Sequence, residues 1–205
     1  MKKKQNFTLI EILTVIAIIG ILAACIFPAL FAVQNSSRRT KTETILTSVN
    51  SAIKVYKGDY NVLPQIRGTV HERIGQWQGD INNMGADEDY YDFFDILTYK
   101  NYKGKGAGAV KVSGLVSESN PKAVQYLDPP KDYFHEDYRL NSVRDAWNRP
   151  LLVFLDHDGD GITEIKHAKV PDADYASDSV ALSMGIQDDA NRFEEIDSGE
   201  IIIVK

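Results

Sequence analysis

Three aspartates at alternating positions form the sequence pattern that most suggests a bound ligand. Asp156, Asp158 and Asp160 have the one-three-five spacing of a calcium-binding loop. Gly161 follows at the sixth position, but the twelfth is His167, where an EF-hand places a bidentate glutamate. The same residues also fit a tight Asp-Gly reversal between two strands. The pattern therefore predicts either a calcium loop or a simple turn.

No set of side chains typical of catalysis emerges elsewhere. None of the four histidines belongs to a zinc-protease motif or lies beside a nucleophile motif: His71, His135, His157 and His167. The glycine run at residues 104–108 lacks the Lys-Ser/Thr pair of a phosphate-binding loop. We therefore predict that the protein is not an enzyme.

The charge of the chain is divided unevenly. Residues 1–56 contain seven Lys or Arg and two acids, so the overall net charge of −6 leaves −11 on residues 57–205. Phosphate contacts need clustered basic residues, so this acidic bulk argues against a nucleic-acid partner. The single cysteine, Cys25, excludes an internal disulfide framework and any Cys-rich zinc site.

The N-terminal region is the most informative part of the chain. From Phe7 to Val33 the only charged residue is Glu11, and Lys2, Lys3 and Lys4 precede this run. A helix needs about 20 apolar residues to cross a bilayer, whereas the core of a cleaved secretory signal has roughly 7–15. The lysines should stay in the cytoplasm, which predicts a membrane-anchored protein with its acidic C-terminal part exported.

Two residues of this run are unusual in a membrane helix. A carboxylate such as Glu11 costs roughly 2.5–3.5 kcal/mol at the bilayer centre and less near the interface. It either reaches the headgroups or meets a positive partner when subunits assemble. Pro28 removes one backbone hydrogen bond and favours a kink, which membrane helices tolerate.

The segment Lys-Lys-Lys-Gln-Asn-Phe-Thr-Leu-Ile-Glu-Ile-Leu-Thr-Val-Ile-Ala-Ile-Ile-Gly-Ile-Leu-Ala-Ala resembles the N-terminus of type IV prepilins and type II secretion pseudopilins. The resemblance implies that a prepilin peptidase cuts between Asn6 and Phe7 and methylates the new N-terminus at Phe7. Glu11 would be the fifth mature residue and Pro28 the twenty-second. The family usually has glycine immediately before the cut, where this chain has Asn6.

A lipoprotein signal is the competing interpretation of this region. Leu22-Ala23-Ala24-Cys25 resembles a lipobox, the signal at which a bacterial lipoprotein is cut and its cysteine is acylated. The acylated residue would be Cys25. Against this, the apolar run continues through Phe31, where lipoproteins usually become polar.

The rest of the chain predicts an α+β fold. Apolar residues recur at helical spacing up to Tyr56, so one helix should run from Phe7 to Lys57 and end at Gly58. A shorter helix is expected at 87–101, and strands at 124–127, 151–155, 162–166, 179–183 and 201–204. A small antiparallel sheet should cover the apolar stripe in the second half of the long helix.

Four regions follow from this pattern. Residues 1–6 form a basic leader peptide and residues 7–33 a transmembrane and assembly helix. Residues 34–57 form its amphipathic continuation, and residues 58–205 an extracytoplasmic globular domain.

The resemblance extends more weakly into the C-terminal half. Residues 145–150 look like the Asp-Pro-Trp-Gly-x-Pro element of major pseudopilins of the G type, with Ala146 and Asn148 as departures. Ser183-Met184-Gly185 resembles their Ser-x-Gly element, and Glu194-Glu195 lies where they have paired acids. In those proteins a calcium ion organises this late loop. The resemblance thus implies a second candidate site, with Ser183, Asp188, Glu194 and Glu195 as ligands, unless the loop is merely acidic and solvated.

These observations predict a structural subunit of a type II secretion pseudopilus or type IV pilus-like filament. It would lie in the bacterial inner membrane with a single pass. Its partners would be copies of itself, related pilin-like subunits, the prepilin peptidase and an inner-membrane assembly platform. The alternative is a membrane-tethered extracytoplasmic binding domain, or a lipoprotein, that never polymerises. Calcium is the only cofactor that the sequence suggests.

Overall fold

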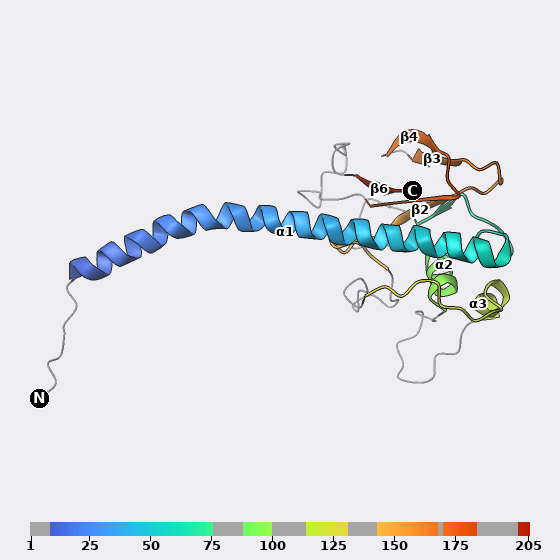
Figure 1. The fold of residues 1–205 in the computed structure, drawn as a ribbon, viewed down its shortest axis with the longest axis horizontal. Helices are drawn as coiled ribbons and strands as arrows, with labels where there is room; N and C mark the ends of the chain where they lie inside the picture. Colours follow the sequence, from blue (N-terminus) through green and yellow to red (C-terminus); the bar gives the residue numbers. More distant parts are fainter. Residues whose placement is uncertain (1–8, 76–87, 100–113, 131–142, 168–169, 184–200) are drawn as a thin grey trace, which may run out of the picture. The chain divides into compact units, whose positions relative to one another are not determined.

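The computed structural model describes residues 9–75, 88–99, 114–130, 143–167, 170–183 and 201–205. Its longest element is helix α1, Leu9–Tyr60 (Figure 1). The chain divides into two compact units, Met1–Arg38 and Arg39–Lys205, and α1 contributes to both.

Helix α1 ends three residues later than the sequence suggested. Gly58 does not stop it; instead Asn61 adopts a left-handed conformation with φ 57° and donates its N–H to the Lys57 carbonyl over 2.7 Å. Asparagine tolerates this conformation better than most residues, so it can close a helix in place of glycine. The additional turn brings the rings of Tyr56 and Tyr60 to 4.6 Å between centroids.

The unit Arg39–Lys205 contains two antiparallel sheets. The larger has the strand order β1-β2-β5-β6, formed by Arg73–Ile74, Leu152–Leu155, Ser179–Ser183 and Ile202–Val204. The smaller is a hairpin of β3, Thr163–His167, and β4, Val170–Tyr175. Two short helices complete the unit: α2, Glu88–Thr98, and α3, Gly114–Ser119. The α+β architecture with a long N-terminal helix and an antiparallel sheet confirms the predicted pilin-like fold class.

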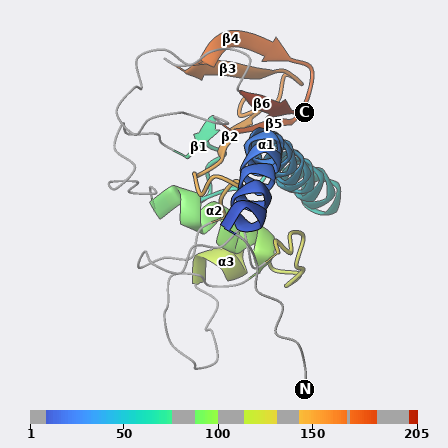
Figure 2. The ribbon, with the colours of Figure 1, turned by 90° about the vertical axis from the view of Figure 1, so that its left-hand side faces the viewer.

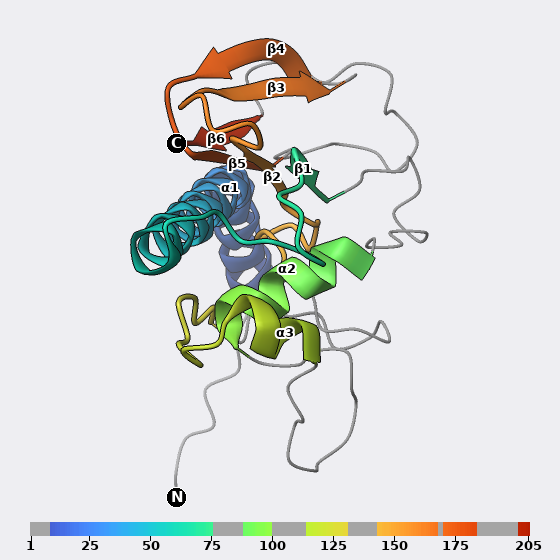
Figure 3. The same cartoon turned by 90° about the vertical axis from the view of Figure 1, so that its right-hand side faces the viewer.

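Alternate residues of the larger sheet enter two separate cores, because successive side chains of a strand point to opposite faces. Val153, Leu155 and Ala181 join the main core. To this core α1 contributes Ile45, Leu46, Val49, Ala52, Ile53 and Tyr56. Phe154 and Leu182 instead pack with Ile165 of the hairpin. The β3–β4 hairpin accordingly lies on one side of the larger sheet, and α2 and α3 lie on the other (Figures 1, 2 and 3).

Helix α2 and strands β2, β3, β5 and β6 confirm the predicted elements, with bounds shifted by up to three residues. The strand expected at 124–127 is wrong: the N–H groups of Tyr126 and Leu127 both donate to the Leu97 carbonyl, so this segment closes the end of α2. Strands β1 and β4 and helix α3 were not predicted. Residues 156–162 connect β2 to β3, but these strands belong to different sheets and do not pair.

Candidate functional site

The first candidate site is the apolar part of α1. Its large hydrophobic side chains are exposed along the whole run from Leu9 to Val33. By length and composition this helix can cross a membrane, and none of its most apolar window is buried in the structure. A buried core helix or a signal sequence can have the same composition, but exposure excludes a buried core helix. The segment is therefore available to lipid or to other helices.

Glu11 lies in the first turn of α1. Its side chain belongs to an exposed stretch, and its backbone carbonyl accepts a hydrogen bond from Thr14 Oγ1 over 3.0 Å. Pro28 lies within α1, which continues past it. Asn6 and Phe7, the residues of the expected cleavage site, lie outside the part of the chain that the structure describes. The roles of all four residues stay predictions.

The aspartate triplet comes together at the loop after β2. One carboxylate oxygen from each of Asp156, Asp158 and Asp160 lies within 4.8 Å of the other two, with Asp156 buried and its neighbours exposed. The loop also has the hydrogen bonds of a turn. Asp156 accepts the N–H groups of Gly159 over 2.8 Å and Gly161 over 3.0 Å. Both glycines have positive φ, 77° and 85°, which side chains rarely adopt.

The two interpretations of the triplet are compatible, because a turn of this kind also gathers ligand atoms. His167, the twelfth residue from Asp156, belongs to strand β3 and not to the loop. The triplet alone would provide only part of the six to eight oxygen ligands that Ca2+ takes. Calcium binding here therefore stays a prediction.

Of the second calcium candidate, the structure describes only Ser183. Its buried hydroxyl donates a hydrogen bond to Asp145 Oδ2 over 2.6 Å. Asp188, Glu194 and Glu195 lie outside the described residues. What the structure adds at this place is a link between Ser183 and the turn at residues 145–150.

Asp145 organises the turn before β2. Its Oδ1 accepts the N–H groups of Trp147 over 2.9 Å and Arg149 over 2.8 Å. Burial raises the pKa of Asp145, while the Ser183 hydroxyl and these two N–H groups oppose the shift. Three donors thus converge on one buried carboxylate, which explains how an acidic side chain is accommodated inside the domain.

The two departures from the pseudopilin element are accommodated structurally. Asn148, in the place of glycine, has φ 67°, a conformation that asparagine tolerates. Ala146, in the place of proline, has an N–H group and donates it to Thr42 Oγ1 of α1 over 3.1 Å. Both substituted residues therefore take part in the turn of this chain, one through its backbone conformation and one through a hydrogen bond to α1.

Two polar residues of α1 were missed by sequence reasoning. Thr42 and Asn50 are buried at 0% and 2% exposure on the stripe that carries the core residues. Asn50 Nδ2 donates to the carbonyl of Val204 in β6 over 2.6 Å, and Ser179 of β5 donates to Asn50 Oδ1 over 3.2 Å. A polar residue at a core position of an amphipathic helix was the available signal, because such residues are buried only with partners.

Comparison with known proteins gives matches at the N-terminal region. Residues 1–25 match the prokaryotic N-terminal methylation motif. The chain is 34% identical over 64 residues to the type II secretion system core protein G of Vibrio cholerae serotype O1, covering 31% of this chain and 44% of that protein. It is 37% identical over 62 residues to the core protein G of Pectobacterium carotovorum, covering 30% and 40%.

A pilin matches as well. The type IV major alpha-pilin of Moraxella bovis is 38% identical over 77 residues, covering 37% of this chain and 48% of the pilin. The chain thus spans less than half the length of each of these relatives. No solved structure gives a significant match. The methylation motif and the similarity to core protein G over the N-terminal region support the assignment of this chain to the pseudopilin family, whose members are structural subunits and not enzymes.

Proposed function

We propose that this protein is a structural subunit of a type II secretion pseudopilus or a type IV pilus-like filament. The observation that carries the proposal is the methylation motif at residues 1–25, which includes the start of a helix with exposed apolar side chains and Glu11 in its first turn. In a filament subunit, the apolar surface of such a helix contacts lipid before assembly and packs against the helices of other subunits after assembly. An open filament results when a head-to-tail interface does not close into a ring.

Processing precedes assembly in this proposal. A prepilin peptidase removes residues 1–6 by cutting between Asn6 and Phe7, and Phe7 is then N-methylated. The precursor is held in the bacterial inner membrane by one pass of α1, with the acidic domain on the extracytoplasmic side. The three N-terminal lysines support this orientation, since basic residues are retained in the cytoplasm. An inner-membrane platform would then extract the subunit.

Glu11 would set the register between subunits. Once the leader is removed, Phe7 has a positively charged amine, and a neighbouring subunit can place it near the Glu11 carboxylate. In an apolar environment such a pair offsets the cost of keeping a carboxylate away from water. Fixing the axial register is the role for which buried polar pairs are best documented.

The proposal is tested by the variant Glu11→Ala, with Glu43→Ala as a matched control. Both changes remove one acid from α1, but Glu43 lies outside the apolar run, where it pairs with Arg39 over 3.2 Å. We expect Glu11→Ala to enter the membrane as well as the native protein, because alanine is cheaper in lipid. Crosslinked multimers and sheared surface fibres should be lost for Glu11→Ala and retained for Glu43→Ala.

The alternative is a membrane-tethered extracytoplasmic binding domain, or a lipoprotein acylated at Cys25, that does not polymerise. A simple anchor has no use for a carboxylate in its first turn. Normal assembly of Glu11→Ala would refute the pilin-type mechanism. The absence of any multimer of the native protein in its own host would favour the tethered domain instead.

A further inference from the structure

Helix α1 has a short basic segment, defined here as Arg38, Arg39 and Lys41, just beyond its apolar run. All three side chains are exposed, and the segment begins five residues after Val33, the last residue of the run. In the described part of the chain, no other stretch of four residues contains three basic residues. Residues 34–58 contain five basic residues and one acid, so this part of the helix is positively charged.

The basic segment begins close to the place where α1 leaves the bilayer. Glu11 costs least at the cytoplasmic interface, and from there residues 12–33 extend about 33 Å, close to the ~30 Å of the hydrocarbon core. The headgroups on each side add roughly 5–8 Å. Along the helix, Arg38 lies about 8 Å beyond Val33 and Lys41 about 12 Å. Side chains of a helix lean toward its N-terminus, so these long side chains can reach back to the headgroups.

Two of the three basic side chains are available to a new partner. Arg38 has no hydrogen bond or ion pair with any residue that the structure describes. Arg39 pairs with Glu43 over 3.2 Å, but the two side chains are 58% and 46% exposed, and an exposed pair of this kind contributes little. Several basic side chains farther along the chain already have acidic partners: Lys57 with Asp178, Lys122 with Asp59, and Lys166 with Glu164.

Two anionic surfaces could accept the basic segment: lipid headgroups, or the acidic domain of another subunit. Residues 57–205 have a net charge of −11, so such a domain is a reasonable competitor. The position of the segment favours lipid, because it follows the apolar run directly and is next to headgroups before any neighbouring subunit is present. Charges act over only about 8 Å at physiological salt, so the nearest anions decide.

We propose that Arg38, Arg39 and Lys41 bind the phosphate groups of anionic phospholipids at the extracytoplasmic surface of the membrane. Guanidinium groups bind phosphate oxygens through paired hydrogen bonds, and an ammonium group binds them as a point charge. The contact fixes the depth of α1 and offsets the repulsion between the acidic domain and an anionic surface. The proposal rests on the membrane anchorage in the proposed function and not on filament formation.

The test uses the full-length protein in vesicles of equal parts phosphatidylglycerol and phosphatidylcholine. The photo-crosslinking amino acid p-benzoyl-phenylalanine replaces Asn35, an exposed residue one turn before Arg38 and Arg39 on the same side of the helix. Mass spectrometry of the intact protein then gives the ratio of phosphatidylglycerol to phosphatidylcholine adducts. We expect a ratio well above one, and a roughly fivefold lower ratio for Arg38→Gln, as expected for one basic residue at an anionic surface.

Two further variants show whether charge and position are responsible. Arg38→Lys retains the charge and should retain most of the native ratio. Lys54→Gln is the matched control, because it also removes one exposed charge from α1, but about 32 Å beyond Val33, where screening prevents an effect on lipid. Its ratio should equal that of the native protein.

The proposal would be overturned by a ratio near one in the native protein, or by equal effects of Arg38→Gln and Lys54→Gln. An unchanged ratio together with a loss of crosslinked multimers for Arg38→Gln would assign the segment to a contact with another subunit instead. Protein that does not float with the vesicles would overturn the membrane anchorage and this proposal with it. Assembly is tested separately by Glu11→Ala, so its failure leaves the lipid contact standing.

Discussion

The hydroxyl of Ser183 at the end of β5 donates a hydrogen bond to the buried carboxylate of Asp145, 38 residues earlier in the chain. Ser183→Ala removes a donor from a carboxylate that water does not reach, and such losses typically cost about 1–3 kcal/mol in the free energy of unfolding. We expect a destabilisation of this size in chemical denaturation. Ser51→Ala, at an exposed position of α1, is the control and should change stability by less than about 0.5 kcal/mol.

The buried carboxyl of Asp145 also predicts a pH dependence. Its pKa is raised above the ordinary value of an aspartate, mainly by burial, so the folded state binds this proton more tightly than the unfolded state. The contribution of Asp145 to stability is therefore greatest at low pH and decreases as the pH rises through the folded-state pKa. Asp145→Asn does not titrate. The difference in unfolding free energy, native minus variant, should fall as the pH rises above about 4 and then level off. A constant difference across this range would contradict a raised pKa.

Processing at Phe7 predicts a specific mass. The mature membrane-extracted protein should begin at Phe7, carry one methyl group and lack the three leader lysines, as intact-mass spectrometry can establish. Asn6→Gly, which restores the residue usual in the family before the cut, should increase the processed fraction in a pulse-chase experiment. An acylated chain beginning at Cys25 would establish the lipoprotein alternative.

Calcium binding, if it occurs, should raise the melting temperature of the protein. A ligand that binds only the folded state stabilises it by about 2.7 kcal/mol at a hundredfold excess over Kd. The full-length protein in detergent should therefore melt at a higher temperature in millimolar calcium than in chelator. Asp158→Asn should remove the shift if the aspartate triplet binds the ion, whereas Asp174→Asn, an exposed acid of β4, should retain it. If Asp158→Asn retains the shift, the ion binds elsewhere, with residues 183–197 as the remaining candidate. An unchanged melting temperature of the native protein would show that the prediction of calcium binding is wrong.

The hydrogen bond between Asn50 and strand β6 predicts that a substitution of Asn50 destabilises β6 more than the rest of the sheet. Asn50→Ala removes the donor to the Val204 carbonyl and the acceptor of the Ser179 hydroxyl. We expect a loss of about 1–3 kcal/mol in the free energy of unfolding, because buried polar groups lose their partners. Hydrogen exchange at Ile202–Val204 should accelerate more than at Leu152–Leu155, since β6 lies at the edge of the sheet and β2 does not. Equal acceleration in both strands would indicate a global effect only.

How much of this structure could be predicted depended on the range of the interactions involved. Helix α1 was predictable because its apolar spacing is a local property. Strand β4 was not, because Val-Pro-Asp-Ala-Asp-Tyr has little intrinsic strand preference and is held by pairing with β3. Residues 124–127 were misassigned because their apolar and aromatic residues favour a strand, whereas their N–H groups bind Leu97.

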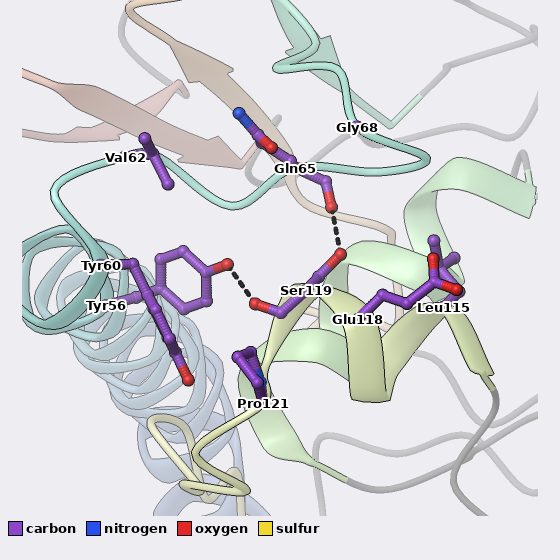
Figure 4. Close-up of a pocket in the computed structure, with 9 residues that line it drawn as sticks. All are labelled: Tyr56, Tyr60, Val62, Gln65, Gly68, Leu115, Glu118, Ser119 and Pro121. Carbon is purple, nitrogen blue, oxygen red and sulfur yellow. Dashed lines mark hydrogen bonds between the residues drawn. The ribbon is translucent and has the colours of Figure 1, made fainter.

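The candidate sites show the same limit. The gathering of Asp156, Asp158 and Asp160 follows from their spacing within one loop and was predictable. The contact between Asp145 and Ser183 depends on the packing of segments that are distant in the sequence. In the sequence, the two residues are notable only because each lies in an element that resembles one of the pseudopilins. A pocket of about 260 Å³ beside the C-terminal end of α1 is lined by residues 56–68 and residues 115–121 (Figure 4). These two stretches are far apart in the sequence, so the pocket had no sequence signal.

The hydrogen bond from the Ala146 N–H to Thr42 Oγ1 has an evolutionary consequence. Proline has no N–H group, so a chain that acquired the usual proline at position 146 would leave the buried Thr42 hydroxyl without this donor. Valine at position 42 has a similar shape and needs no hydrogen bond. The two positions, 104 residues apart, should therefore behave as an epistatic pair, in which each substitution is harmful alone and tolerated with the other. A chain that evolves the usual proline at position 146 should therefore also need a substitution at position 42 of the long helix.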